Sequence, residues 1–381
     1  MSYSKQISEN KVWIDGVWAK LDDKLSDLSV KSRYKLPYTT INGVHDDKSD
    51  DILWWTNGFW GGLMWLMYIG TKKECYKKTA EISEEKLDAA FNKMDSWHHD
   101  VGFIWHLTSG VNYRLTGNID SKNRNMIAAM SLMSRYNIAG EFIRCWNSWQ
   151  GGEDVSGWTI VDCMMNIPIL YWASDLIGDT RYKKVAIKHA DMTMRDHVRE
   201  DGYVNHIVIH DTEKPNTVLG IRKGQGYKEY SSWSRGTSWA LYGFVISYLY
   251  TKEKRYLDTA IKVADRFIVE TEKTNWLTRL DFLQPDKPLY YDSTAGAIAS
   301  CGLIELSKIV KGKQQDYYLN AAFNILKAAE VNWCNWSKDE DSILQMGSEM
   351  YSKGVHIPII YGDFFFAEAI FKLKGNDFLV W

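Results

Sequence analysis

Two aspartates have the residue type and spacing expected of a pair of acid–base groups. Asp100 lies in HHDVGF and Asp162, 62 residues later, lies in TIVDCMMN; each begins an apolar segment of helical periodicity. The apolar neighbours Val161, Cys163 and Met164 disfavour a carboxylate anion, so that Asp162 could remain protonated and act as a general acid. Asp100 could tune that tendency and bind hydroxyl groups. Because aspartate is also a favoured helix N-cap, either residue taken alone has a purely structural alternative. Their matched positions favour chemistry.

A third candidate is Arg235, which lies within the largely apolar segment SSWSRGTSW. A buried arginine needs an anion nearby. That anion could be Asp292, Asp363 or a carboxylate on the ligand. The loop before this segment supplies two further side chains that could complete a polar wall, His206 and Gln225. His98 and His99, beside Asp100, remain ambiguous, and neither has metal-ligand spacing to another histidine.

Six similar segments must position these residues. Each is apolar around most of its circumference, which is typical of a helix buried on nearly all sides, and five of them end at glycine. After most of them comes a more polar segment with tyrosine and alanine four residues apart, as in KRYLDTAIKVAD. Buried helix followed by amphipathic helix, six times over, predicts an all-α fold, an (α/α)6 barrel of six inner and six outer helices. The inner segments are 55–70, 99–117, 159–178, 232–251, 292–312 and 361–375.

The starts of the inner helices are expected to share one pocket. Connections at that end are long, and long loops on a rigid scaffold commonly carry function. We expect an outer helix over 8–29, and a short strand within 201–211 that forms a hairpin followed by the turn 223–227. Tryptophan is abundant there and suits sugar rings, although it could simply fill a wide barrel. The polar residues at the six starts are Thr56, Asp100, Asp162, Arg235, Asp292 and Asp363, and the nearby tryptophans include Trp54, Trp55, Trp146, Trp149 and Trp239.

Composition narrows the function classes. The chain has 381 residues and a net charge of −2 without a basic cluster, so we expect no nucleic-acid partner. We expect no membrane segment and no leader peptide, because no apolar run is long enough and the start is polar. The five dispersed cysteines indicate reduced thiols of a cytoplasmic protein. No spacing suggests a metal ion or cofactor. A ring cannot be divided, so residues 1–381 are expected to form a single catalytic domain.

Several of these segments together resemble the unsaturated glucuronyl hydrolases, glycoside hydrolase family 88. The similarity covers about residues 50 to 375 and rests on WTNGFWGG, HHDVGF, TIVDCMMNIPILYWAS, GQGY followed by SSWSRGTSWALYGF, and YGDFFFAEA. It implies an (α/α)6 barrel that acts on small disaccharides released by polysaccharide lyases, of the glycosaminoglycan type. Such disaccharides carry a 4-deoxy-hex-4-enuronate at the non-reducing end.

The resemblance also implies roles for individual residues. Asp162 would be the proton donor and Asp100 the second essential carboxylate. The subsite for the unsaturated sugar would be lined by Trp55, Trp146, His206, Gln225, Arg235 and Trp239. The match at Trp146 could shift to Trp149. A substrate sulfate could meet Ser348, Ser352 or Lys353, although the segment SKGVHIPIIYGD is more apolar than the family pattern.

The reaction implied by the resemblance is hydration of a vinyl ether. A proton added to C4 would create an oxocarbenium-like centre at C5, water would add there, and the resulting hemiketal would open and expel the neighbouring sugar. Three alternatives remain open: hydrolysis with a separate acid and base acting on the glycosidic bond, an unsaturated rhamnogalacturonyl hydrolase of family 105, and a non-catalytic sugar-binding barrel.

Overall fold

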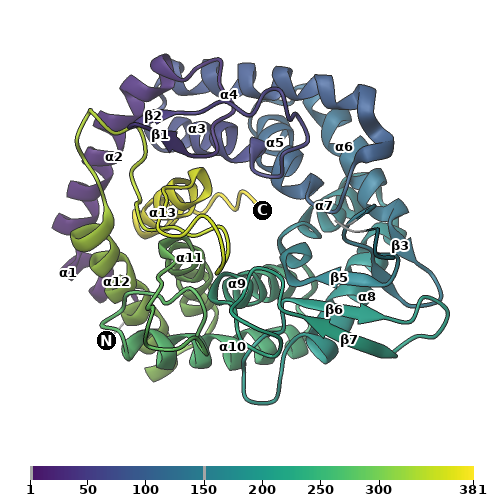
Figure 1. The fold of residues 1–381 in the computed structure, drawn as a ribbon. Coiled ribbons are helices and arrows are strands. Elements are labelled where there is room, and N and C mark those ends of the chain that lie inside the picture. Colours follow the sequence, from purple (N-terminus) through teal and green to yellow (C-terminus); the bar gives the residue numbers. More distant parts are fainter. Residues whose placement is uncertain (1–2, 149–151) are drawn as a thin grey trace.

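The protein folds as two concentric rings of helices, seen along the barrel axis in Figure 1. The computed structural model describes residues 3–148 and 152–381. Inner and outer helices alternate along the chain, which confirms the predicted (α/α)6 barrel. The inner ring comprises α3 (Asn57–Thr71), η2 with α5 (Gly102–Gly110 and Val111–Thr116), η3 with α7 (Val161–Met165 and Pro168–Ile177), α9 (Ser234–Thr251), α11 (Ser293–Ile309) and α13 (Ile360–Leu373).

The outer ring is amphipathic. Its helices are α2 (Lys11–Lys31), α4 (Glu74–Lys86), α6 (Ile119–Ser134), α8 (Thr180–Asp196), α10 (Lys254–Glu272) and α12 (Lys313–Trp333), with α1 (Tyr3–Glu9) before α2 and η1 (Leu87–Ser96) after α4. The tyrosine–alanine repeat lies on the buried face, as Tyr256 and Ala260 of α10 show. Three of these tyrosines link neighbouring outer helices by donating hydrogen bonds: Tyr76 to Asp22, Tyr256 to Asp191 and Tyr318 to Asp265.

The inner helices approach one another closely where they carry the two aspartates. A Cβ atom at Gly102 would lie 2.7 Å from the Cα atom of Asn166 on the neighbouring inner segment, so that only glycine fits there. Gly102 also begins η2, which is a π-helix, and η3, which contains Asp162, is a 3-10 helix. Irregular turns of this kind are frequent at functional sites.

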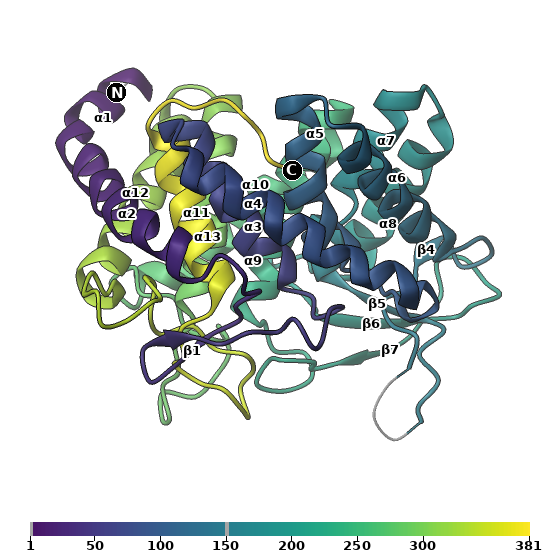
Figure 2. The same cartoon turned by 90° about the horizontal axis from the view of Figure 1, so that it is seen from above.

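The long connections gather on one face of the barrel, as the side view in Figure 2 shows. That face carries two short hairpins, β1 (Thr40–Ile41) with β2 (Val44–His45) and β3 (Tyr136–Asn137) with β4 (Phe142–Ile143). It also carries an antiparallel sheet of β5 (Trp158–Ile160), β6 (Ile207–His210) and β7 (Val218–Arg222). In its register, Ile160 pairs with Ile207. This register brings the residues just after β5 and just before β6 together.

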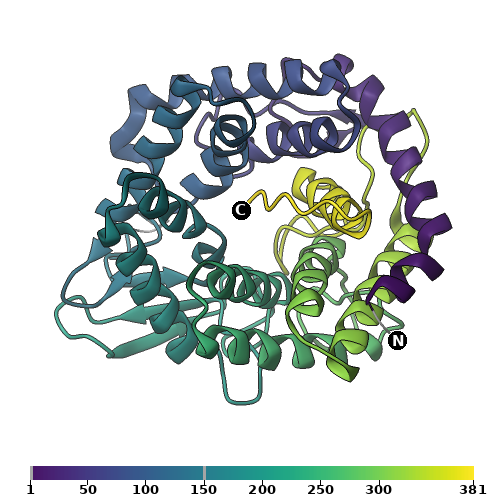
Figure 3. The same ribbon diagram turned by 180° about the vertical axis from the view of Figure 1, so that it is seen from behind.

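The opposite end of the barrel is filled from within. Figure 3 shows the last residues running to the centre of the ring. The Trp381 ring is fully buried, stacks on Phe365 at a centroid distance of 5.7 Å, and donates a hydrogen bond from Nε1 to Glu368 at 3.1 Å. Among the described residues, none of the helices has the length and apolar character needed to cross a bilayer.

The structure corrects two local predictions and confirms a third. The expected helix over 8–29 is two helices that meet at Asn10. The short strand expected within 201–211 is confirmed, since β6 covers 207–210 and forms a hairpin with β7; the sheet also contains β5, which was not foreseen. Gly70 does not end its helix, which runs on to Thr71; a Cβ there would meet the Trp18 ring at 2.5 Å, so this glycine serves packing.

Candidate active site

A cavity of about 450 Å³, here called the main cavity, opens at the starts of the inner helices. A disaccharide-sized ligand would fit a volume of this order. Six residues singled out from the sequence line it: Trp55, Asp100, Trp146, Asp162, His206 and Gln225. The other lining residues are Trp54, His99, Ile160, Ile207, Gly224 and Met350.

The sheet places Asp162 beside His206. The Val161 backbone N–H donates to the His206 carbonyl at 3.1 Å, directly between the end of β5 and the start of β6. The His206 Nε2 atom then lies 3.5 Å from Asp162 Oδ1. Asp162 is 8% exposed, and its Oδ1 accepts no hydrogen bond from the described residues. Because Oδ1 is buried and faces His206, a ligand in the main cavity would meet the exposed remainder of the Asp162 side chain.

The proton on His206 can be assigned from its other nitrogen. The Gln225 backbone N–H donates to His206 Nδ1 at 3.0 Å, so Nδ1 is the acceptor and the neutral ring carries its proton on Nε2, facing Asp162. A Cβ at Gly224 would lie 2.1 Å from Nδ1, and this glycine has φ +55°, so the close turn requires glycine. The Trp233 ring packs on the imidazole at 4.2 Å.

Asp100 is held by three side-chain donors. His98 Nδ1 and His99 Nε2 lie 3.0 and 3.2 Å from its Oδ2 atom, and Asn166 Nδ2 donates to Oδ1 at 3.4 Å. Burial alone would raise the pKa of Asp100, but the two histidines and Asn166 together lower it below its usual value. Asp100 is therefore an anion and a hydrogen-bond acceptor near neutral pH, unlike a proton donor.

Asn166 ties the two aspartate segments together. Its Nδ2 atom also lies 3.3 Å from the Asp162 carbonyl oxygen, while its Oδ1 accepts the Phe103 backbone N–H at 2.9 Å. The side chain is fully buried. It fixes the start of η2 relative to the start of η3.

Arg235 forms an ion pair with Asp292, one of the partners considered from the sequence. Both side chains are fully buried. Burial lowers the pKa of Arg235, but the Asp292 charge more than offsets it and raises the pKa overall. The guanidinium also donates to the carbonyls of Ser348 and Glu349, and it packs against Trp233. Arg235 thus holds the backbone of the loop before α13.

A smaller volume of about 120 Å³, here called the side pocket, adjoins the main cavity. Arg235 and Lys353 line it, together with Tyr38, Trp54, Trp55, Gln225, Glu349, Met350 and Tyr361. The Lys353 ammonium is at its edge, with a side chain 77% exposed and Nζ 3.9 Å from a carboxylate oxygen of Glu349. The two chambers share walls, so one ligand could extend into both.

Several other residues expected at the site lie elsewhere. Trp239 is fully buried behind the cavity, where it packs on Phe103 and Phe365. Ser352 is exposed and lines neither chamber, while Ser348 is buried and donates to the Tyr291 carbonyl. Thr56, Asp292 and Asp363 begin inner helices but line neither chamber; Asp363 accepts the backbone N–H groups of residues 343 and 344. Trp149 lies outside the described residues.

The comparisons with known proteins identify the family. No family model matches the chain. The unsaturated glucuronyl hydrolase of Bacillus sp. strain GL1 is 30% identical over 341 residues, which cover 87% of this chain and 88% of that protein. The unsaturated chondroitin disaccharide hydrolase of Streptococcus pyogenes is 30% identical over 326 residues, 84% and 80% of the two chains. The chain belongs to the unsaturated glucuronyl hydrolases. It is therefore a glycoside hydrolase, and the resemblance seen in its motifs is confirmed.

Solved structures of the family agree with the fold. The Bacillus sp. GL1 unsaturated glucuronyl hydrolase superposes with a TM-score of 0.86 at 26% identity, over 94% of this chain and 97% of that one. An unsaturated glucuronyl hydrolase specific for heparin gives 0.81 at 26% identity, over 94% and 98%. The similarity extends over nearly the whole barrel.

Sequence reasoning missed part of this hydrolase's cavity. Ile160 and Ile207 line it because β5 and β6 pair, and Met350 because the loop before α13 folds inward. No local pattern signals these contacts. For His99, the position next to Asp100 was the sequence feature that could have indicated a role. The ring lines the cavity, and its Nδ1 atom has no hydrogen-bond partner among the described residues. Burial lowers the pKa of His99 to about 4, so the ring is neutral.

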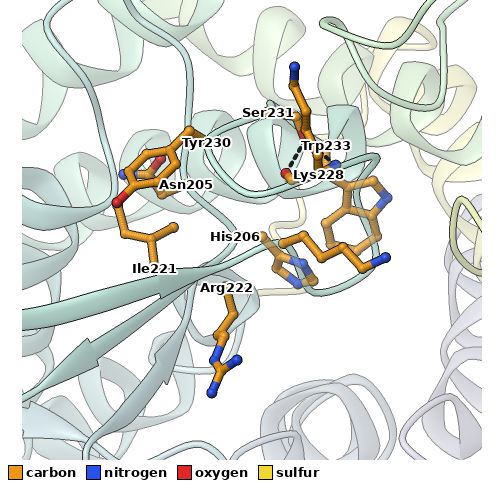
Figure 4. Close-up of a pocket in the computed structure, with 9 residues that line it drawn as sticks. Asn205, His206, Ile221, Arg222, Lys228, Tyr230, Ser231 and Trp233 are labelled. Atoms are coloured by element: carbon orange, nitrogen blue, oxygen red, sulfur yellow. Dashed lines mark hydrogen bonds between the residues drawn. The ribbon is translucent and has the colours of Figure 1, made fainter.

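Behind His206 lies a third, much smaller cavity, drawn in Figure 4. Its volume of about 10 Å³ is at the lower limit for one water molecule. His206 separates it from the main cavity, and Trp233 and Ser231 line its far side, where Ser231 Oγ donates to the Lys228 carbonyl at 2.7 Å. This cavity cannot hold a sugar. Nor do the described residues contain a cluster of side chains that could bind a metal ion.

Proposed function

We propose that this hydrolase cleaves unsaturated uronyl disaccharides of the chondroitin and hyaluronan type, which polysaccharide lyases release from glycosaminoglycans. The observation that carries the proposal is the contrast between its two carboxyl groups in one disaccharide-sized cavity. Asp100 is held ionised by its contacts with His98, His99 and Asn166, whereas Asp162, which lines the same cavity, accepts no hydrogen bond at Oδ1 from the described residues. The names of the relatives, which include chondroitin disaccharide hydrolases, support the substrate class.

In the proposed mechanism, Asp162 donates its proton to C4 of the 4-deoxy-hex-4-enuronate. The C4–C5 double bond then becomes a single bond, and positive charge develops at C5 and the ring oxygen. Water adds to C5 and returns a proton to Asp162, which closes the cycle. The product is a hemiketal; its C5–O5 bond opens to a ketone, and the hemiacetal left at C1 expels the neighbouring sugar.

Asp100 supports the same step without giving up a proton. Its fixed negative charge stabilises the positive charge that develops in the sugar ring, and it costs little reorganisation because His98, His99 and Asn166 already hold it. It can also accept hydrogen bonds from ring hydroxyl groups. The N–H group at His206 Nε2 can donate a hydrogen bond to Asp162 once that residue has become an anion, without giving up its proton.

The remaining side chains bind and position the substrate. Trp55 and Trp146 offer aromatic faces to the sugar rings, and Gln225 can donate hydrogen bonds from the boundary between the two chambers. We assign Arg235 and Trp239 to support of the cavity walls. Lys353 is the candidate for a substrate sulfate at the side pocket. We further propose that residues 1–381 form one catalytic unit, and that the unpaired thiols reflect a cytoplasmic location.

Loss of the alkene's ultraviolet absorbance tests this function directly. Unsaturated disaccharides from chondroitin, hyaluronan, heparin and rhamnogalacturonan are offered to the wild type, and we expect turnover of the first two. Activity confined to the rhamnogalacturonan product would instead support the family 105 alternative.

Asp162→Asn should lower turnover by about 10²–10⁴-fold or more, because the amide cannot donate a proton to carbon. Asp175→Asn is the matched control, since Asp175 is exposed at the far end of the same inner segment. Turnover by Asp162→Asn within tenfold of the wild type would reject Asp162 as the donor.

A further inference from the structure

His98 connects two walls of the main cavity without lining it. It lies between η1 and η2, with a side chain 22% exposed. Its Nδ1 atom is 3.0 Å from Asp100 Oδ2, and its Nε2 atom is 3.1 Å from the Leu53 carbonyl oxygen. Leu53 immediately precedes Trp54 and Trp55, two of the aromatic residues that line the main cavity. One imidazole ring therefore spans the second carboxylate and the tryptophan segment.

The two contacts favour a doubly protonated ring. A carboxylate oxygen and a carbonyl oxygen are both acceptors, and a neutral imidazole has only one N–H group. Both contacts can be hydrogen bonds only if both ring nitrogens carry protons. The Asp100 backbone N–H also points at Nδ1, but at 3.3 Å, which is longer than the 3.0 Å contact to the carboxylate. The imidazolium form satisfies the two shorter contacts.

The proton resides on the histidine rather than on Asp100. The carboxylate also accepts from His99 and Asn166, and donors on both of its oxygens favour the anion. We propose that His98 is a positioning residue which, as an imidazolium, holds the Asp100 anion and the Leu53–Trp55 segment at a fixed distance during catalysis. The proposal rests on the function proposed above for Asp100.

The surrounding charges are consistent with a protonated ring. The groups that face His98 are Asp100, the neutral His99 ring at a centroid distance of 6.1 Å, and Arg135, whose Nη1 donates to the Trp97 carbonyl. Burial and Arg135 lower the pKa of His98, but the Asp100 contact and the Leu53 carbonyl raise it overall above its ordinary value. At alkaline pH the ring loses one proton, and one of its two hydrogen bonds must break.

The pH dependence of kcat/KM distinguishes positioning through this charge from simple packing. We expect the wild type to show an alkaline limb whose midpoint lies above the ordinary histidine value and shifts with temperature as an imidazole does. In His98→Gln, which is neutral and can donate to only one of the two acceptors, kcat/KM near neutral pH should fall about 10–100-fold. The alkaline limb should disappear with it.

His210→Gln is the matched control. It removes another buried histidine–aspartate contact, 2.9 Å long, between residues outside the main cavity, so it should keep the limb. An alkaline limb retained in a folded His98→Gln would overturn the proposal. A wild type without such a limb would also overturn it, and this second result does not depend on the folding of a variant. Failure of the proposed function is recognised separately, since it would leave the wild type inactive on every glycosaminoglycan disaccharide or leave Asp162→Asn active.

Discussion

The buried ion pair between Arg235 and Asp292 predicts a large effect of a small substitution. Asp292→Asn preserves the size of the side chain, and its Oδ1 can still cap α11 by accepting the Thr294 backbone N–H, as Asp292 does at 3.1 Å. The substitution removes the charge and replaces Oδ2, the acceptor of the Arg235 hydrogen bond, with an NH₂ donor. Arg235 is then left as a fully buried cation, which packs on an aromatic ring and donates to neutral carbonyls.

The expected loss in the free energy of unfolding is about 3–5 kcal/mol, the cost of removing one partner from a buried pair. The upper part of this range is appropriate because both side chains are fully buried, so that water cannot solvate the arginine charge left without a partner. Because Arg235 anchors the Ser348 and Glu349 carbonyls, next to Met350 of the cavity wall, kcat/KM should fall as well.

Urea unfolding followed by tryptophan fluorescence measures the effect. Asp179→Asn provides the control. Like Asp292, Asp179 caps the start of a helix, here α8, and pairs with an arginine, but the side chain of that arginine, Arg181, is 75% exposed. This control should leave the unfolding midpoint nearly unchanged. If the two variants shift the midpoint equally, burial of the pair does not determine its contribution, and the reasoning fails.

Three further predictions concern substrate charge, acid stability and the closed end of the barrel. Lys353→Ala should lower kcat/KM for a sulfated chondroitin disaccharide relative to the unsulfated one. If the ratio of the two kcat/KM values does not change, Lys353 does not contact the sulfate. Below pH 6.5 the protein should lose stability by about 1.4 kcal/mol per pH unit for each histidine that is buried as a neutral ring, because the unfolded chain then binds protons that the folded one does not; chemical denaturation between pH 7 and 5 would show no such slope if these rings were protonated in the native state. Trp381→Ala should cost about 3–5 kcal/mol of stability, which thermal and urea unfolding can both measure, since a fully buried indole leaves a large cavity; a loss below about 1 kcal/mol would mean that the barrel end collapses around the gap. The stability prediction concerns five buried histidines. Burial lowers the pKa of His45 and of His99 to about 4 and that of His197 to about 3. It lowers the pKa of His106 and of His189 well below the usual value.

The repeating pattern of the chain determined the architecture. A helix that is apolar on all sides, such as α9, can only be an inner one, and a helix with one apolar stripe, such as α10, can only cover it. The motifs around Asp100 and Asp162 predicted that both carboxyl groups share one pocket, and together with the motifs of the other inner segments they predicted the family. These features are encoded within single helices, so that periodicity and local sequence reveal them.

The tertiary structure decided which side chains meet. Arg235 and Asp292 are 57 residues apart on different inner helices, and only closure of the ring selects this partner over Asp363, which instead binds the loop before its own helix. Trp239 begins an inner helix as expected, yet its position on the helix circumference turns it away from the cavity and into the aromatic core.

Strand β5 and the contacts between loops could likewise not be predicted from the sequence. Pairing of β5 with β6 brings Asp162 to His206 across 44 residues of chain, and Asn166 reaches Asp100 from the next repeat. Such contacts depend on the relative placement of segments that are far apart in sequence, and no periodicity encodes that placement. The sequence therefore determined which residues are candidates for the chemistry, whereas packing around the closed ring determined their partners and hence their charge states.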